Sequence, residues 1–168
     1  MRIEPAKRED IPRLALIAEL SYRSAFAGIL EDEILSTRDA AFFAERFETS
    51  WERMLVAFSG ESPSGFLLMT EGHIDMLFMD PRSSRRGGGA LLLREAERLG
   101  ATSLECFRDN RHARQFYERH GWRVVHEYER DFAGRSRNFV LYKKPFSAVS
   151  QSNDTASPDS FIRSKDNP

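Results

Sequence analysis

Residues 73–99 read HIDMLFMDPRSSRRGGGALLLREAERL, and this stretch decides the fold of the chain. Its first part, His73 to Met79, is an apolar run that predicts a strand ending at Asp80-Pro81. A basic, glycine-rich segment follows. Residues 89–99 then repeat apolar side chains at helical spacing up to Gly100, a residue type that commonly ends a helix. The order strand, glycine loop and helix is typical of a site for a phosphorylated ligand.

The glycine loop has the chemistry of an anion-binding site. Glycine allows a tight turn and lets the backbone approach a ligand with no Cβ in the way. The free N–H groups of the first helical turn favour an anion, and Arg85 and Arg86 add two positive charges beside them. A P-loop would need Lys-Ser/Thr where Ala90-Leu91 stands. A dinucleotide-binding loop would need a further glycine and an acidic residue after the next strand.

A second pattern follows at residues 110–122, which read NRHARQFYERHGW. Asn110 is a good helix cap, and Gly121 ends the predicted helix. Asn110, Ala113 and Tyr117 are spaced i, i+3 and i+7, so they lie on one face of that helix. A phenol and an amide therefore share this face.

Together, the two patterns resemble those of the GCN5-related N-acetyltransferase (GNAT) superfamily. Motif A of that superfamily has the form Gln/Arg-x-x-Gly-x-Gly/Ala, and Gly87 and Gly89 take its two small positions. Gly88 fills the variable position between them, and Ser84 stands where Gln or Arg is usual. The helix after the superfamily's fifth strand carries the form Asn-x-x-Ala-x-x-x-Tyr-x-x-x-Gly-aromatic, which is the second pattern. The nearest resemblance is to small, stand-alone bacterial members.

The resemblance covers Arg2 to Lys144 and implies an α/β (α+β) domain with the GNAT fold. That fold is a mixed, mostly antiparallel sheet of six to seven strands, flanked by about four helices and splayed between the fourth and fifth strands. Apolar patterning indicates the same element order independently. Strands are predicted over residues 2–6, 54–58, 65–70, 73–79, 103–107, 122–128 and 137–143, and helices over 11–27, 31–47 with a break near Ser36-Thr37, 89–99 and 111–120.

We expect one domain over residues 1–146. Residues 147–168 are rich in Ser, Asp, Asn and Pro and poor in apolar side chains, so a disordered C-terminal tail is predicted there.

The resemblance also implies that acetyl-CoA lies where the fourth and fifth strands separate. The pantetheine arm would pair with the main chain of Leu77, Phe78 and Met79. Asn110 would cap its helix and also bond the pantetheine. The pyrophosphate would lie on the glycine loop, formed by Arg85, Arg86, Gly87, Gly88, Gly89 and Ala90.

Tyr117 matches the position of the family's usual general acid. A phenol has an ordinary pKa of about 10, so it is protonated at neutral pH and can give a proton to a departing thiolate. Without the resemblance, the same tyrosine would be interpreted as a core aromatic.

The candidates for the general base are His73 and Asp75. The position where histone acetyltransferases of the superfamily carry a catalytic glutamate falls on His73, whose side-chain type accepts a proton near neutral pH. Asp75 shares its strand face by the period of two. Two alternatives stay open. In the first, His73 merely ends a turn and Asp75 bonds the backbone. In the second, no side chain acts as the base.

Composition excludes several classes of protein. The 168 residues carry a formal net charge of −1 and a pI near 6.4, which does not mark a general binder of nucleic acid or membrane. No apolar run approaches the ~20 residues of a membrane span, and no signal-peptide core is present. The single cysteine, Cys106, fits a cytoplasmic protein and is expected to be packed rather than nucleophilic. No metal-ligand spacing occurs.

The predicted function is transfer of acetyl from acetyl-CoA to a primary amine of a small molecule or protein, by direct attack. The acidic run Glu31-Asp32-Glu33 either attracts a cationic amine or is a solvated helix start. The alternatives are a non-catalytic acyl-CoA sensor or interaction module of the same fold, and a nucleotide-phosphate binder. The resemblance leaves a homodimer open.

Overall fold

The computed structural model describes residues 1–83 and 85–145. The tail predicted for residues 147–168 lies outside this part. Seven strands and five α-helices form the described fold. In chain order they are β1 (Arg2–Pro5), α1 (Ile11–Phe26), α2 (Asp32–Thr37), α3 (Ala40–Phe47), β2 (Met54–Ser59), β3 (Ser62–Thr70), β4 (His73–Met79), α4 (Gly88–Arg98), β5 (Ser103–Phe107), α5 (Arg111–Arg119), β6 (Arg123–Phe132) and β7 (Arg135–Lys143). Two short 3-10 helices, η1 (Arg8–Asp10) and η2 (Trp51–Arg53), precede α1 and β2.

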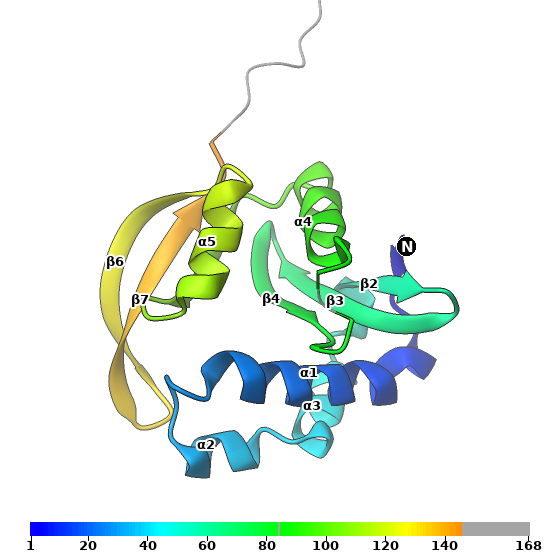
Figure 1. Ribbon diagram of the computed structural model, residues 1–168, viewed down its shortest axis with the longest axis horizontal. Helices are drawn as coiled ribbons and strands as arrows, with labels where there is room; N and C mark the ends of the chain where they lie inside the picture. Colours follow the sequence, from blue (N-terminus) through cyan, green and yellow to red (C-terminus); the bar gives the residue numbers. More distant parts are fainter. Residues whose placement is uncertain (84, 146–168) are drawn as a thin grey trace, which may run out of the picture.

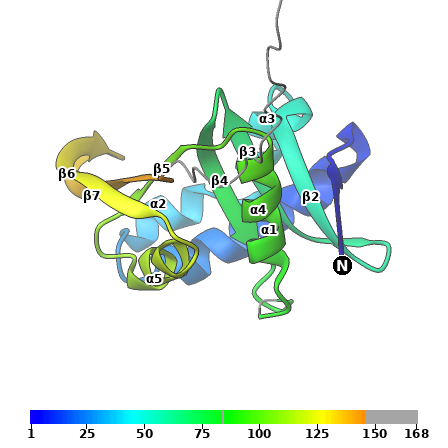
Figure 2. The same ribbon diagram turned by 90° about the horizontal axis from the view of Figure 1, so that it is seen from above.

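The strands form one sheet in the order β1-β2-β3-β4-β5-β7-β6. Every neighbouring pair is antiparallel except β4 and β5, which are parallel. Only two residue pairs join these two strands, His73 with Ser103 and Ile74 with Leu104. Beyond Ile74 the strands separate, and the β6–β7 ribbon curves away from β2–β4 (Figures 1 and 2). The predicted mixed sheet with a splay between its fourth and fifth strands is therefore confirmed.

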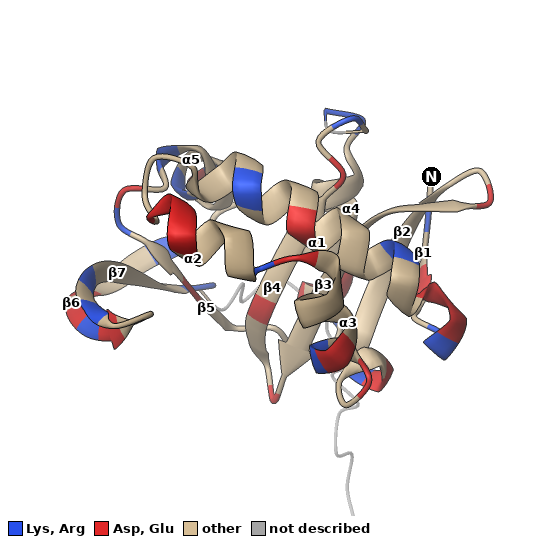
Figure 3. Ribbon diagram, turned by 90° about the horizontal axis from the view of Figure 1, so that it is seen from below, with Lys and Arg blue, Asp and Glu red and all other residues tan. Residues whose placement is uncertain are grey.

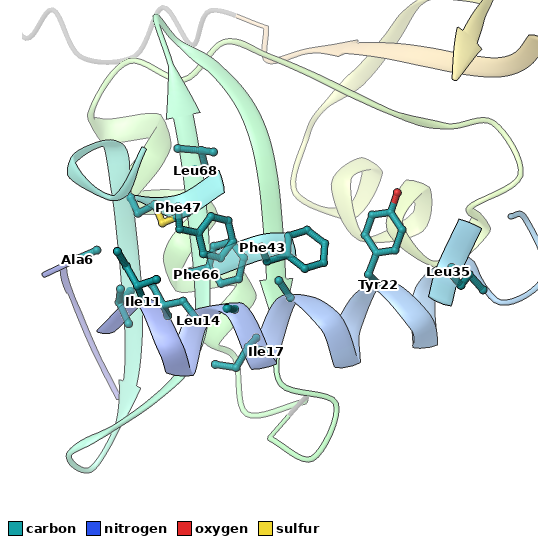
Figure 4. Close-up of a cluster of buried hydrophobic side chains, with 14 of the residues drawn as sticks. Ala6, Ile11, Leu14, Ile17, Tyr22, Leu35, Phe43, Phe47, Phe66 and Leu68 are labelled. Carbon is teal, nitrogen blue, oxygen red and sulfur yellow. The ribbon is translucent and has the colours of Figure 1, made fainter. Parts of the chain in front are cut away.

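Helices cover both faces of the sheet. α1, α2 and α3 lie on one face, where Leu14, Ile17 and Phe43 pack with strand residues such as Phe66 (Figure 4). α4 and α5 lie on the other face, where Leu92, Leu93 and Ala96 pack with Leu67, Ile74, Leu104, Tyr117 and Trp122. The apolar stripe predicted for α1 faces the core, with Ile11, Leu14, Ala15, Ala18 and Tyr22 all buried.

The helix predicted over residues 31–47 is two helices, so the described fold has five rather than about four. α2 ends at Thr37, and α3 begins at Ala40. The Asp39 side chain accepts a hydrogen bond from the Phe42 N–H at 2.8 Å, which starts a new helix instead of continuing the old one. The break therefore comes slightly later than the predicted one near Ser36-Thr37.

Several strands are longer than the sequence pattern predicted, and β3 and β6 differ most. β3 begins at Ser62 rather than Gly65, because Gly60 and Glu61 alone make the turn after β2, and Gly60 has a φ of 63°. Pro63 is tolerated because it lies where the β2–β3 register shifts at a bulge. β6 extends to Phe132, so a long two-stranded ribbon with β7 reaches past the rest of the sheet.

Candidate active site

A cavity of about 380 Å³ lies where β4 and β5 separate, and we call it the central cavity. Its walls come from α1, α3, β4, β5, α5, β6 and β7, which are far apart in the sequence. Six of the predicted site residues line it together: His73, Asp75, Leu77, Phe78, Asn110 and Tyr117. The strand split thus brings together all three predicted catalytic side chains.

A β-bulge in β4 sets the direction of Asp75. The register with β3 passes from Leu68 opposite Met76 to Met69 opposite Ile74, which leaves Asp75 as the extra residue. A bulge of this kind bends a strand and redirects one side chain. Asp75 Oδ2 accepts a hydrogen bond from Thr70 Oγ1 at 2.5 Å, and Arg53 donates to the same Thr70 oxygen. The alternative in which Asp75 bonds the backbone is not what the structure shows.

His73 lies at the closed end of the split. Its Nδ1 is 2.8 Å from Ser103 Oγ, across the first of the two residue pairs that join β4 to β5. Ser103 is only 9% exposed, so this partner is buried. If Nδ1 donates to the serine oxygen, Nε2 keeps its lone pair and can accept a proton. His73 also lines the central cavity, so its place is compatible with the predicted role.

Tyr117 reaches the central cavity from α5. Asn110 caps this helix by accepting from the Ala113 N–H at 3.2 Å, and Gly121 follows it with a φ of 84°. The Tyr117 ring packs between Trp122 and Tyr142, with centroids 6.4 and 5.9 Å away. Burial raises the pKa of the Tyr117 phenol above its ordinary value, so the group stays protonated throughout the neutral range. Its hydroxyl makes no hydrogen bond to any described residue.

The glycine loop lies at the other end of β4. Gly87 has a φ of 83° and caps α4, which begins one residue earlier than predicted, at Gly88. The first intrahelical bond runs from the Leu91 N–H to the Gly87 carbonyl, so the N–H groups before it have no partner within the helix. Arg85 and Arg86 are exposed beside them, and Figure 3 shows the basic segment before α4. β4 has seven residues, which separates the loop from His73 by about 20 Å.

Met79 differs from the other two residues predicted to face the pantetheine. It does not line the central cavity, and its carbonyl accepts a hydrogen bond from Ser21 Oγ at 2.5 Å. Leu77 and Phe78 do line the cavity. Within the described residues, no strand pairs with β4 beyond Ile74 on the side of β5. Apart from the Met79 carbonyl, which Ser21 binds, its main-chain groups on that side are therefore left without a strand partner.

Asp80 is a structural anchor that the sequence analysis interpreted only as the end of a strand. Its side chain is buried and binds Arg13 of α1 at 2.6 Å and Arg82 at 3.0 Å. The hydrogen bonds from Arg82, joined by those from Arg13, outweigh the effect of burial and lower the pKa of Asp80 to about 2. This carboxylate therefore ties the start of the glycine loop to α1.

Several cavity residues were missed by sequence reasoning. Tyr22 fits the apolar stripe of α1, so nothing in the pattern marked it as a cavity residue, yet its hydroxyl points away from the helix (Figure 4). Glu105 of β5 and Arg130 of β6 also line the cavity and bind each other, with Arg130 Nε 3.1 Å from Glu105 Oε1. Tyr128 donates to the same carboxylate. The available signal was that Glu105 is a charged residue inside a strand whose other residues are uncharged.

Glu31 of the acidic run has a structural partner. It binds Arg137 at 2.6 Å and Arg135 at 3.0 Å, which ties the start of α2 to β7. The hydrogen bond from Arg137 is the main reason that the pKa of Glu31 is lowered. Asp32 and Glu33 are exposed on α2, where Figure 3 shows acidic residues. Neither residue lines the central cavity. The run is therefore mostly a solvated helix start.

Cys106 lines the cavity but lacks the features of a nucleophile. Burial raises the pKa of its thiol to about 12, so the reactive thiolate is scarce at neutral pH. Among residues 1–83 and 85–145, no group of His, Cys, Asp and Glu side chains has the arrangement of a metal site. No helix in these ranges is both long and apolar enough to span a membrane.

The sequence matches the profile of a known protein family. The profile of the family described as "Acetyltransferase (GNAT) domain" matches residues 26–143. Among curated proteins, the chain is similar to the uncharacterized N-acetyltransferase YafP of Escherichia coli strain K12. The identity is 30%, and the match covers 66% of this chain and 77% of that protein.

Solved structures share the fold. A PaiA N-acetyltransferase from Thermoplasma acidophilum, in complex with coenzyme A, matches with a TM-score of 0.68 and 23% identity over 85% of this chain and 98% of that one. Apo-form YjaB of Escherichia coli matches with a TM-score of 0.71 and 22% identity over 87% and 98%. A GCN5-related N-acetyltransferase from Rhodopseudomonas palustris matches with a TM-score of 0.69 and 25% identity over 85% and 94%.

Proposed function

The chain belongs to the GNAT acetyltransferase family, and from this premise we propose that it transfers the acetyl group of acetyl-CoA to a primary amine by direct attack in a ternary complex. One observation carries the proposal. The cavity at the split between β4 and β5 holds His73, Asp75 and Tyr117 together, and the unpaired side of β4 leads from it toward the glycine loop.

This geometry matches the shape of acetyl-CoA. That molecule carries its thioester and its pyrophosphate at opposite ends of an extended arm with amide groups. These amides could form hydrogen bonds with the unpaired main-chain groups of β4, as the backbone of a neighbouring strand would. The anionic pyrophosphate suits the N-terminus of α4 with Arg85 and Arg86. The thioester would then lie in the central cavity.

Direct attack requires an amine without its extra proton. The amine nitrogen forms the new C–N bond to the thioester carbon, and its proton passes to a base. His73 Nε2 is suited to this step, because Ser103 holds the opposite ring nitrogen. Asp75 Oδ1, which has no hydrogen-bond partner among the described residues, can hold the ammonium or an ordered water beside it.

The tetrahedral intermediate collapses as the C–S bond breaks. The electron pair goes to sulfur, and the departing thiolate is stabilised by a hydrogen-bond donor or a proton. Tyr117 lines the central cavity, and its raised pKa keeps the hydroxyl protonated at neutral pH. Because that hydroxyl makes no hydrogen bond to a described residue, it is available to donate to the sulfur. The products are the acetylated amine and coenzyme A with a free thiol.

The test follows the release of coenzyme A thiol when acetyl-CoA and a panel of primary amines are mixed with the protein. Mass spectrometry of the products then identifies an acetylated amine. We expect amine-dependent thiol release and a product heavier by one acetyl group. Tight binding of acetyl-CoA by calorimetry without turnover across small amines and peptides would refute catalysis and favour the acyl-CoA-binding module. Equal affinity for ATP would refute acetyl-CoA as the ligand.

A further inference from the structure

A second cavity of about 230 Å³, which we call the side cavity, adjoins the central one. Its lining includes Thr49, Ser50, Arg53 and Thr70. Arg46 of α3 and Asp75 of β4 line both cavities. These two residues therefore lie at the junction between the central cavity, where the acetyl transfer is proposed, and the side cavity.

Arg46 is the charged lining residue that the protein leaves unmatched. Its guanidinium makes no hydrogen bond or ion pair with any described residue, whereas Arg130 binds Glu105 and Arg53 binds Thr70. Arg46 and Asp75 face the same two cavities, yet they form no ion pair with each other within the described structure. Opposite charges that share a space without touching are suited to a ligand that carries both charges.

The charge balance around this junction is positive. Glu105 is already held by Arg130, so Asp75 is the one lining carboxylate, among the described residues, that no arginine binds. The positive charges of Arg38 and Arg46 also act on the Tyr22 hydroxyl in the cavity wall. Arg137 acts on it too, but Glu31 pairs with that arginine. A ligand with several positive charges would therefore meet repulsion here.

Aromatic rings form the rest of this wall. Phe26 of α1 lies 4.6 Å from Tyr22 and 5.1 Å from Phe107, measured between ring centroids. Phe107 in turn lies 5.4 Å from Phe132 and 4.8 Å from Phe139. All five residues line the central cavity. A continuous wall of packed rings favours an apolar group in the ligand.

We propose that the acceptor is a small amine that also carries an acidic group and an apolar side chain, as an apolar amino acid does. Arg46 binds the acidic group, the amine lies between Asp75 and His73, and the aromatic wall receives the side chain. The inference rests on the proposed acetyl transfer, and the reaction is the same step, in which the amine displaces the thiol. Such a site would disfavour polyamines and aminoglycosides, which carry several positive charges.

The experiment compares matched acceptors. Leucine, methionine, phenylalanine and tryptophan are each assayed beside their amides, which keep the amine and side chain but lack the acid. The aminophosphonate analogue of phenylalanine distinguishes a carboxylate from a phosphate-like group, and spermidine represents polycations. The readout is kcat/KM from thiol release. The variants are Arg46→Gln, Arg46→Lys and, as a control for loss of an exposed arginine elsewhere, Arg123→Gln.

We expect at least one acidic acceptor to exceed its amide by about 10-fold or more, the effect of one charge-assisted hydrogen bond. Arg46→Gln should bring this ratio close to one, mainly through KM, and Arg46→Lys should retain part of it. Arg123→Gln should keep it unchanged. A preferred phosphonate also supports the acidic-group inference and assigns the anion as phosphate-like.

Two results overturn the inference and leave the acetyltransferase function standing. One is turnover of amides or spermidine at least as fast as that of the acidic acceptors. The other is an acid-to-amide ratio that Arg46→Gln does not change. Absence of turnover with every amine, despite acetyl-CoA binding, overturns the proposed function and the inference with it.

Discussion

His73 Nδ1 lies 2.8 Å from Ser103 Oγ, at the point where β4 and β5 still pair and just before they separate. The contact with Ser103, where the two strands still pair, thereby holds the imidazole beside the cavity that forms where they separate. Because a buried serine holds one ring nitrogen, the other is the nitrogen that would receive the proton of the amine in the proposed reaction. This relationship makes Ser103 a positioning residue for the candidate base.

His73→Gln should lower kcat/KM for the accepted amine by about 10²-fold near neutral pH, the usual contribution of a positioned base. The affinity for acetyl-CoA, measured by calorimetry, should stay nearly unchanged. Ser103→Ala should reduce kcat/KM less than His73→Gln does. His112→Gln removes an exposed imidazole on α5 and should leave kcat/KM unchanged. Equal kcat/KM values for wild type and His73→Gln would exclude the base role.

Tyr117→Phe should lower kcat by about 10²-fold and leave the affinity for acetyl-CoA nearly unchanged, because the hydroxyl acts on the departing sulfur. Tyr142→Phe is the matched control. Its ring is buried and lies 5.9 Å from the Tyr117 ring, measured between centroids. Tyr142 does not line the central cavity, so loss of its hydroxyl removes no group from the site. Single-turnover kinetics with calorimetry separate the two effects. Equal rates for Tyr117→Phe and wild type would assign the tyrosine to the core alone.

Gly87→Ala should destabilise the start of α4 by about 1 kcal/mol and weaken acetyl-CoA binding, because the residue has a φ of 83° that a Cβ disfavours. Gly28→Ala is its control. A Cβ meets no atom within 4 Å at either glycine, but only Gly87 has a positive φ. Urea unfolding and calorimetry with acetyl-CoA measure both effects. Equal affinities for the two variants would show that the loop conformation does not matter for the ligand.

Asp80→Asn should destabilise the fold at pH 7 by roughly 2 kcal/mol, the free energy linked to lowering its pKa from 3.8 to about 2. Because the folded-state pKa is lowered, this contribution is present above pH 4 and is lost as the pH falls toward 2. The difference in unfolding free energy between wild type and variant, from urea titrations, should shrink over that range. The exposed Asp109→Asn should show little difference at any pH. A difference for Asp80→Asn that grows on acidification contradicts the account.

Cys106 should react slowly with iodoacetamide at pH 8 in the folded protein, because burial raises the pKa of its thiol to about 12. The chain has one cysteine, so mass spectrometry reports this site alone. Protein unfolded in urea should react fully within the same time and is the internal control. Rapid alkylation of the folded protein would mean that the cavity wall opens at β5.

Local patterns predicted most of the fold. The apolar stripe of α1, the glycine at φ 83° before α4 and the Asn110 cap of α5 depend on residues within a few positions of each other. The break at Asp39 was misplaced because a side-chain cap competes with continuing the helix, and the pattern alone does not decide which wins.

The sequence by itself determined the family, the glycine loop and the identity of Tyr117 and His73 as candidates, because each rests on a short motif. Only the tertiary structure decided that Asp75 is a bulged residue and that Asp80 joins α1 to the loop. It alone placed the unmatched Arg46 and an aromatic wall around one cavity. These depend on contacts between distant segments, and the register and packing that create such contacts leave no periodic trace in the chain.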